Sequence, residues 1–422
     1  MSDIGPIKRW YFEEFDPPNE APFSRDEYRG RWERIRAAME TAGIGCLVLT
    51  APESICYVTG YAAEWYQANG PEGWVPGSCA VLHVDHDAPI QFDDEEEVTL
   101  VRFTSVVDDV RIGPGLGTDM VDFVVDELRA AGWLDGRVGV ERRSYRPHPA
   151  AAAYADAAFA RAGAETVDAT SVARSVRRWK TPAELEVVRE AQRVADVGMA
   201  AARDAMAPGV TELEVYGAII HAMASAGGEV AAIPLPVVSG YRASTVHGLA
   251  SRRKLEPGDV VNVDVCGVVN RYHANMARCF SIGEPSAPVR GRIDDVSRAV
   301  DVVAGLLRPG LPVRELLATV EAYYRDTGLW GDEWWIGGYE LGIAFPPDWV
   351  GDFYYEAGSD PGDETFRSGD VVNYEANFYL PEAKGLALSI NTLSFEDDGA
   401  AFLQSTPSEL FVVRRLRAGF GV

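Results

Sequence analysis

Two carboxylates interrupt strongly β-forming stretches of this 422-residue chain. Asp264 lies in NVDVCG and Glu375 lies in VVNYEANFY, each among β-branched or aromatic residues. A buried carboxylate is rare unless it is paired, hydrogen-bonded or holding a cation. We therefore expect both acids to serve one site, with Asn275, eleven residues after Asp264, as a neutral donor and acceptor beside them. The structural alternative for Asp264 is an ion pair with Arg278, which we otherwise expect to contact a substrate.

Three further side chains could complete such a site. His247, in STVHGLAS, lies on an expected loop that leads into a strand, where a histidine can serve as a general base. Tyr339 follows two glycines that let the backbone approach a ligand, and Trp349 ends the rigid stretch PPDW, a plausible pocket wall. Each has a structural alternative, namely a surface or capping histidine, a packed aromatic ring and an ordinary turn.

The elements that must position these residues lie in the C-terminal part of the chain. Helices that begin at Thr181 and Thr211 each carry a glutamate three residues after the threonine, which is the pattern of a capping box. After residue 228 the chain changes to alternating strands separated by glycine and proline turns, with two more helices between them. Residues 173–422 therefore predict an α+β domain with a largely antiparallel sheet.

The N-terminal part has a different pattern. Residues 1–24 contain four prolines and mixed charge, and we expect an extended arm there. Helical and strand patterns alternate over residues 25–172, including an expected strand at residues 55–61 (ICYVTGY). This alternation predicts a separate α/β domain.

Composition narrows the possible partners. The chain has 39 basic and 64 acidic residues, a net charge of −25, and such an acidic surface repels nucleic acid but tolerates a small cationic or zwitterionic substrate. No apolar run is long enough to cross a bilayer, and the first residues lack the apolar segment of a signal peptide. The five cysteines show no paired spacing, which is typical of reduced thiols. We therefore predict a cytoplasmic protein without nucleic-acid or membrane partners.

The order of these motifs resembles the pita-bread superfamily, which includes methionine and proline aminopeptidases, prolidases, creatinases and ectoine hydrolases. The resemblance rests on SICYVTGY, on the linker RRWKTPAELEVVREA, and on the series HGLASRRKLEPGDVVNVDVCGVVNRYHANMARCF. It covers nearly the whole chain. It implies a creatinase-type N-terminal domain over residues 25–172 and a pita-bread catalytic domain over residues 173–422.

The metallopeptidases of this superfamily hold their metals with two aspartates, a histidine and two glutamates. Carried over singly, these five ligands fall on Asp264, Asn275, Tyr339, Glu375, and either Ile390 or Asn391. At most two of the five are retained as carboxylates. Divalent ions require several oxygen or nitrogen ligands, so the resemblance implies that a two-metal site does not form and that no cofactor is needed.

Creatinases are similar in this respect, because they work without a metal. They use a loop histidine as acid and base and a glutamate on a late strand to bind the substrate, which match His247 and Glu375. A further creatinase glutamate falls on Ala277, whereas GYELGIAFPPDW is closer to the ectoine-hydrolase pattern. The resemblance implies a metal-independent hydrolase that cleaves a C–N bond of the amidine, guanidine or amide type, with Asp264 and Glu375 gripping a cationic substrate.

Other readings of the same residues remain open. The chain could be a metal-dependent Xaa-Pro peptidase or a sulfoniopropionate lyase of the same fold, or a binding protein without activity. Creatinase-like relatives are dimers in which the N-terminal domain of one subunit borders the active site of the other. We therefore expect a homodimer, with Trp65 in the segment 60–74 as a candidate substrate contact.

Overall fold

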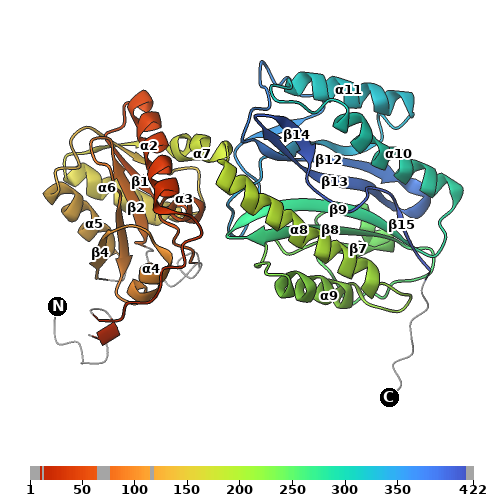
Figure 1. The fold of residues 1–422 in the computed structure, drawn as a ribbon, viewed down its shortest axis with the longest axis horizontal. Coiled ribbons are helices and arrows are strands. Elements are labelled where there is room, and N and C mark those ends of the chain that lie inside the picture. Colours follow the sequence, from red (N-terminus) through yellow and green to blue (C-terminus); the bar gives the residue numbers. More distant parts are fainter. Residues whose placement is uncertain (1–9, 12–13, 64–76, 115–117, 415–422) are drawn as a thin grey trace. The chain divides into compact units, whose positions relative to one another are not determined.

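The structure is a computed structural model that describes residues 10–11, 14–63, 77–114 and 118–414. The chain divides into two compact units, Met1–Arg177 and Arg178–Val422 (Figure 1). The first is an α/β unit and the second an α+β unit, so the predicted fold class is confirmed. Within the described residues, no helix is long and apolar enough to span a membrane.

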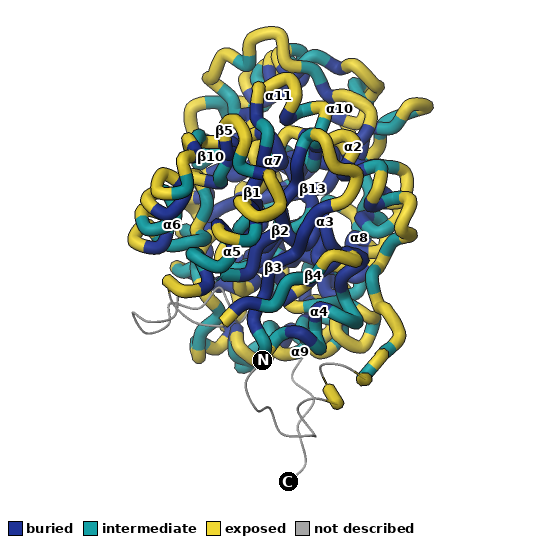
Figure 2. Tube along the Cα trace, turned by 90° about the vertical axis from the view of Figure 1, so that its left-hand side faces the viewer, coloured by how far each residue is buried: buried dark blue, intermediate teal, exposed yellow. Residues whose placement is uncertain are grey.

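The first unit is built on a six-stranded mixed sheet with the order β4-β3-β2-β1-β5-β6. Its strands are β1 (Cys46–Leu49), β2 (Cys79–His83), β3 (Ile90–Asp94), β4 (Asp109–Gly113), β5 (Arg137–Val140) and β6 (Glu165–Asp168). Its helices are α2 (Arg25–Ala42), α3 (Pro52–Thr59), α4 (Val98–Thr104), α5 (Thr118–Ala130), α6 (Pro149–Arg161) and α7 (Thr170–Arg178). Figure 2 shows β2 and β3 running through buried residues, whereas the outer turns of α6 are exposed.

One element of this unit differs from expectation. Residues 55–61, predicted as a strand, lie mostly in helix α3, which begins with Pro52 and ends at Thr59, with Gly60 as its C-cap. Proline is favoured in the first helical turn, and Gly60 adopts the left-handed conformation (φ 84°) that closes a helix. These end signals outweigh the β-forming residues between them, and every residue of α3 except Glu53 is buried.

The second unit is built on a nine-stranded sheet whose main path is β11-β10-β12-β13-β9-β8-β7. Its strands are β7 (Val237–Ser239), β8 (Val260–Val269), β9 (Tyr272–Ile282), β10 (Glu333–Tyr339), β11 (Tyr354–Glu356), β12 (Val371–Leu380), β13 (Gly385–Glu396), β14 (Gly399–Phe402) and β15 (Phe411–Val413). Every strand pair is antiparallel except β15 with β9, as the sequence predicts.

Helices α8 (Pro182–Ala205) and α9 (Glu212–Ser225) begin with complete capping boxes at Thr181 and Thr211, as predicted. Helix α8 packs closely on β8, since a Cβ atom at Gly267 would lie 1.9 Å from the carbonyl oxygen of Ala191. Side chains alternate between the two faces of a strand. The odd-numbered residues of β8 therefore face α8, and Asp264 faces the opposite side of the sheet.

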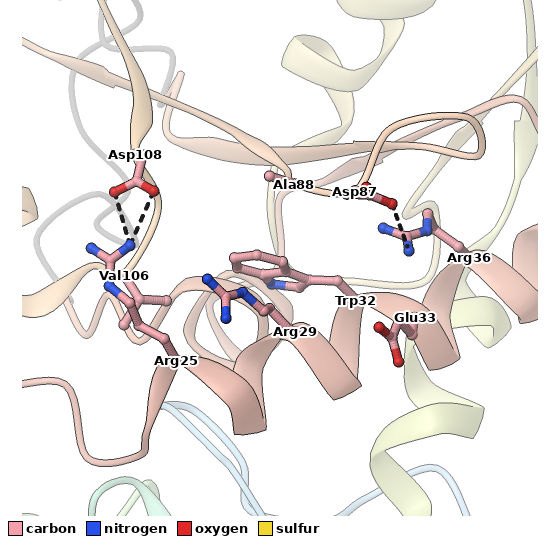
Figure 3. A pocket seen from close by; sticks show the side chains of 9 residues that line it. All are labelled: Arg25, Arg29, Trp32, Glu33, Arg36, Asp87, Ala88, Val106 and Asp108. Atoms are coloured by element: carbon pink, nitrogen blue, oxygen red, sulfur yellow. Dashed lines mark hydrogen bonds and ion pairs between the residues drawn. The ribbon is translucent and has the colours of Figure 1, made fainter.

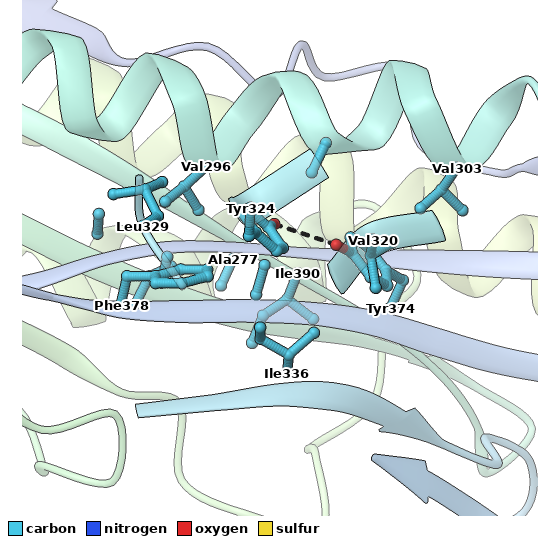
Figure 4. Close-up of a cluster of buried hydrophobic side chains, with 14 of the residues drawn as sticks. Ala277, Val296, Val303, Val320, Tyr324, Leu329, Ile336, Tyr374, Phe378 and Ile390 are labelled. Carbon is cyan, nitrogen blue, oxygen red and sulfur yellow. Dashed lines mark hydrogen bonds between the residues drawn. The ribbon is translucent and has the colours of Figure 1, made fainter. Parts of the chain in front are cut away.

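Helices α10 (Ala287–Ala304) and α11 (Val313–Asp326) cover the sheet near β12 and β13. A large apolar core lies between these helices and the sheet, and in it the hydroxyls of Tyr324 and Tyr374 are 3.1 Å apart (Figure 4). The Tyr374 side chain points toward Tyr324 of α11, so Glu375, the next residue along the strand, projects to the other face of β12. Asp264 thus lies on the face of β8 that points away from α8, and Glu375 lies on the face of β12 that points away from α11.

Candidate active site

Asp264 and Glu375 lie in one row of paired residues that crosses the sheet of the second unit. Asp264 pairs with Ala277, Ala277 with Ile390, Ile390 with Glu375, and Glu375 with Gly337. Directly paired residues project to the same face of a sheet. The backbone therefore places the two carboxylates on one face, separated by the apolar side chains of Ala277 and Ile390. We call Asp264, Ala277, Ile390 and Glu375 the acid row.

A chain of amide side chains connects the two acids. The backbone N–H of Tyr339 donates to Asn373 Oδ1 (2.7 Å), and Asn373 Nδ2 donates to Glu375 Oε1 (2.7 Å) and to Asn275 Oδ1 (3.2 Å). Asn275 Nδ2 in turn donates to Asp264 Oδ1 (2.6 Å). Asn275, predicted as a neutral neighbour of Asp264, thus bonds it directly.

Glu375 has two further neighbours. The hydroxyl of Tyr339 is hydrogen-bonded to its carboxylate, and Trp349 Nε1 donates to that hydroxyl (3.1 Å). Asn377 Nδ2 donates to Glu375 Oε2 (3.3 Å). The structure therefore brings Tyr339 and Trp349 to Glu375. Sequence reasoning missed Asn373 and Asn377, although both lie two residues from Glu375 and hence on the same face of the strand.

A buried ion pair helps to hold the segment between Tyr339 and Trp349 in place. Lys180 Nζ lies 2.8 Å from Glu340 Oε1, and the backbone N–H of Asp352 donates to Glu340 Oε2 (3.2 Å). Gly351 leaves the space for this pair, since a Cβ atom there would lie 2.7 Å from Glu340 Cβ. Glu340 directly follows Tyr339, so the ion pair helps to hold the Tyr339 backbone in place.

Burial and mutual repulsion keep the two acids from ionising easily. Burial raises the pKa of Glu375 to about 7, although hydrogen bonds from Tyr339, Asn377 and Asn373 oppose this. Burial, and then the negative charge of Glu375, raise the pKa of Asp264 well above its usual range. A cation between these acids would favour their ionised forms and lower both pKa values.

The raised pKa of Glu375 predicts a pH-dependent stability. Between about pH 4.5 and pH 7 the unfolded chain loses the Glu375 proton while the folded chain keeps it. We expect the free energy of unfolding to fall by roughly 3 kcal/mol as the pH rises through this window, and to level off above it. Denaturant titrations of the wild type and the Glu375→Gln variant at pH 5 and pH 8 check this. An equal pH dependence of both proteins would contradict it.

His247 lies apart from the acid row. It is exposed on the loop between η2 (Gly240–Ser244) and β8, and its ring meets that of Trp334 edge to face, with centroids 5.7 Å apart. Within the described part of the chain, no hydrogen bond or ion pair joins His247 to either acid. Trp334 belongs to β10, the strand whose Gly337 pairs with Glu375, so the imidazole lies against an element of the site.

A second histidine near the site, His273, has both ring nitrogens engaged in hydrogen bonds. His273 is fully buried: Ala232 N donates to its Nε2 (3.1 Å), and its Nδ1 lies 2.8 Å from the carbonyl oxygen of Arg271. Burial and the Arg271 charge lower the pKa of His273 to about 3. It therefore stays neutral, and its ring packs beside Trp349.

Arg278 does not join the site, contrary to the prediction that it contacts a substrate. Alternation along β9 turns Arg278 to the face opposite Asn275 and Ala277. Its guanidinium is fully buried and donates to four carbonyl oxygens, those of Pro407 (2.7 Å), Ala277 (2.8 Å), Ile390 (2.8 Å) and Thr406 (3.0 Å). It therefore ties the segment after β14 to the sheet, and it forms no ion pair with Asp264.

Trp65 lies outside the described residues. Its predicted contact with a substrate, and the proposed dimer in which an N-terminal domain borders the partner's site, therefore stay predictions. Gel filtration checks the dimer.

Comparison with known proteins decides the family. Residues 186–400 match the family model described as Metallopeptidase family M24, and residues 31–179 match that of the Creatinase/Prolidase N-terminal domain. The chain belongs to metallopeptidase family M24. The predicted superfamily is thereby confirmed, and the second unit is an M24 domain of the pita-bread type.

Relatives within the M24 family differ in what they act on. The chain is 26% identical over 415 residues to the ectoine hydrolase of Halomonas elongata, covering 93% of this chain and 98% of that one. It is 27% identical over 241 residues to the Xaa-Pro dipeptidase of Pyrococcus furiosus, covering 57% of this chain and 66% of that one. The solved Xaa-Pro dipeptidase of Bacillus anthracis shares the fold, with a TM-score of 0.76, 21% identity, and coverage of 91% and 99%.

The metal centre that the M24 family name implies does not fit the residues at this site. Of the five ligand positions only Asp264 and Glu375 carry a carboxylate, and Asn275 turns its Nδ2 toward Asp264. Ile390 occupies the acid row, whereas Asn391 is bonded to Gln404 and Ser408 away from it. Among the described residues, no three His, Cys, Asp or Glu side chains gather where they could hold a metal ion. Two acids separated by apolar side chains cannot bridge two divalent ions.

A pocket in the first unit lies outside the residues that match the M24 model and is a weaker candidate for a functional site. It has a volume of about 320 Å³ and lies along α2, beside Trp32 (Figure 3). Its three arginines are already paired, because Arg25 contacts Asp108, Arg29 contacts Asp26 and Arg36 contacts Asp87. Exposed ion pairs of this kind are ordinary surface features.

Proposed function

We propose that this M24 protein is a metal-independent hydrolase that cleaves a C–N bond in a small cationic or zwitterionic substrate. The observation that carries the proposal is the acid row, in which apolar side chains separate the two carboxylates and Ile390 stands at a position where a metal would need a ligand. Glu375 is buried and Asp264 is half-buried, and without a cation the two acids repel each other and remain partly protonated. A positively charged substrate replaces the missing positive charge.

An amidinium or guanidinium group suits this arrangement. Its charge is spread over a plane, and its N–H groups form charge-assisted hydrogen bonds with carboxylates. Asp264 and Glu375 would hold such a group, with Tyr339 and Trp349 as the wall beside Glu375. The nearly full-length similarity to an ectoine hydrolase supports this reading, because ectoine is a cyclic amidine that hydrolysis opens.

His247 is the proposed acid and base. It would take a proton from the water that attacks the amidine carbon, and the new C–O bond would form as that proton leaves. The same histidine would return the proton to the departing nitrogen as the C–N bond breaks. Its exposed imidazole against Trp334 of β10 supports a role at the edge of the site.

The metal-dependent Xaa-Pro peptidase is the main competing activity. We expect the purified protein to contain no stoichiometric divalent metal, and prolonged treatment with a chelator to leave hydrolysis of cyclic amidines unchanged. Elemental analysis and activity assays before and after chelation check this, with a prolidase treated in parallel as the control. A metal at about one or two ions per chain that is needed for activity would contradict the proposal.

Replacement of His247 by asparagine separates catalysis from binding. We expect kcat to fall roughly 10²–10⁴-fold, because general acid–base catalysis contributes about that factor, while substrate affinity changes little. His148, the capping residue of α6 in the first unit, provides the control substitution His148→Asn. Wild-type turnover by the His247→Asn variant would remove His247 from the mechanism. Failure of the wild type to turn over any amidine, guanidine or amide would favour a binding protein instead.

A further inference from the structure

The hydrogen bonds of the site have a fixed polarity. A backbone N–H can only donate, so the bond from Tyr339 N makes the Asn373 side-chain atom facing it the oxygen. The Asn373 NH₂ group must then face Glu375 and Asn275, and the atom of Asn275 that it meets must also be an oxygen. Consequently, the NH₂ group of Asn275 faces Asp264 and the carbonyl oxygen of Val265.

All of these donors therefore point inward, at protein acceptors. Asn373 and Asn275 each use their NH₂ group on two partners, and Asn377 points its own at Glu375. The Tyr339 hydroxyl is occupied as well, because it bonds Glu375 and accepts from Trp349. Both N–H groups of Asn373 and of Asn275 are thus engaged, and of the amide donors only the second N–H of Asn377 has no partner among the described residues.

Acceptors, by contrast, remain open. Asn377 is fully buried, and its Oδ1 is a buried atom without a hydrogen-bond partner. Among the residues that the structure describes, Asp264 Oδ2 forms no hydrogen bond either, since its neighbour Asn275 bonds Oδ1 alone. Buried polar atoms normally have partners, so an orphaned oxygen beside Glu375 indicates a group that something else must satisfy.

We infer that the substrate's cationic group carries at least two N–H donors and that Asn377 Oδ1 accepts one of them. This inference rests on the proposed function, because it assumes that the acid row holds the cation. Amidinium, guanidinium and ammonium groups meet the requirement. Quaternary ammonium and sulfonium groups carry the charge but no N–H, so they leave Asn377 Oδ1 and the acids without hydrogen bonds. Asn377 is thus a specificity-determining residue, and the lyase reading with a sulfonium substrate is disfavoured.

Calorimetric titration of the full-length protein with three matched probes tests the inference. Guanidinoacetate, glycine betaine and dimethylsulfonioacetate share a carboxymethyl group and differ in the cation. We expect guanidinoacetate to bind at least about tenfold more tightly than either methylated probe. If the three probes bind the wild type equally well and all bind the Glu375→Gln variant more weakly, the inference is overturned, whereas the proposed cation site is retained. Affinities that do not respond to Glu375→Gln, or no binding of any probe, would overturn the proposed function itself.

Variants of Asn377 test its own part. We expect Asn377→Leu to bring the guanidinoacetate-to-betaine affinity ratio close to one, and Asn377→Asp, which keeps an acceptor, to preserve the preference. Asn391→Leu, on the adjacent strand β13, is the control that leaves the ratio unchanged. Thermal midpoints of all variants monitor folding. An unchanged ratio in Asn377→Leu would overturn the assignment of Asn377.

Discussion

Replacement of Glu375 by glutamine is expected to weaken the binding of a cationic substrate roughly a hundredfold or more. Glu375 is 7% exposed, and its charge is held by Asn373, Asn377 and Tyr339 rather than by a basic side chain. A cation bound in this place therefore becomes the partner of a buried charge. Removing one member of such a pair costs about 2–5 kcal/mol, because the other is left buried without compensation.

The same variant has an opposite effect on the empty protein. Glutamine cannot ionise, so the repulsion with Asp264 disappears and the ligand-free variant is expected to be more stable than the wild type at pH 8. Titration calorimetry with guanidinoacetate and denaturant unfolding measure the two effects. Glu382→Gln, at an exposed position just after β12, is the matched control. Unchanged affinity in Glu375→Gln would exclude the acid row as the cation site.

Replacement of Arg278 by methionine is expected to lower the free energy of unfolding of the second unit by about 3–5 kcal/mol. Methionine fills much of the volume of the arginine but leaves four carbonyl oxygens without their donor. Buried acceptors left unpaired cost about 1–3 kcal/mol each, and partial access of water to Thr406 and Pro407 reduces the total. Burial already lowers the pKa of Arg278 to about 10, which reflects how thoroughly the guanidinium is enclosed.

Urea-induced unfolding measures this effect, with Arg298→Met as the control. Arg298 lies on the exposed side of α10 and pairs with Asp295 three residues earlier, so its loss should change stability by less than about 1 kcal/mol. A stable Arg278→Met variant that has lost substrate binding would restore the prediction that Arg278 contacts the substrate.

The sequence alone predicts much of the fold because its local signals agree with one another. The capping boxes at Thr181 and Thr211, and the long alternating strands around Asp264 and Glu375, each favour the structure that forms. At residues 55–61 the local signals conflict. There the β-forming side chains favour a strand, whereas Pro52 and Gly60 mark the ends of a helix, and the helix forms.

The site is only partly predictable, for a physical reason. Side chains alternate between the two faces of a strand, so the sequence alone could have predicted that Asn373 and Asn377 lie beside Glu375. By the same rule it could have predicted that Arg278 lies on the face of β9 opposite Asn275. The pairing of Ile390 with both Glu375 and Ala277 depends on the register of strands far apart in sequence. A shift of that register by one residue would exchange Ile390 for Asn391, and no local pattern in the sequence distinguishes the two.

The acid row also restricts which mutations this protein can accept during evolution. Ile390→Glu or Asn275→Asp alone would add a buried carboxylate beside two that already repel each other, before enough ligands exist to hold a cation. Each single step toward a metal cage therefore passes through a less stable protein. Mutations that reshape the surroundings of an organic cation at this site meet no such barrier. New activities should arise in this lineage by exchange of substrates far more readily than by recovery of a metal.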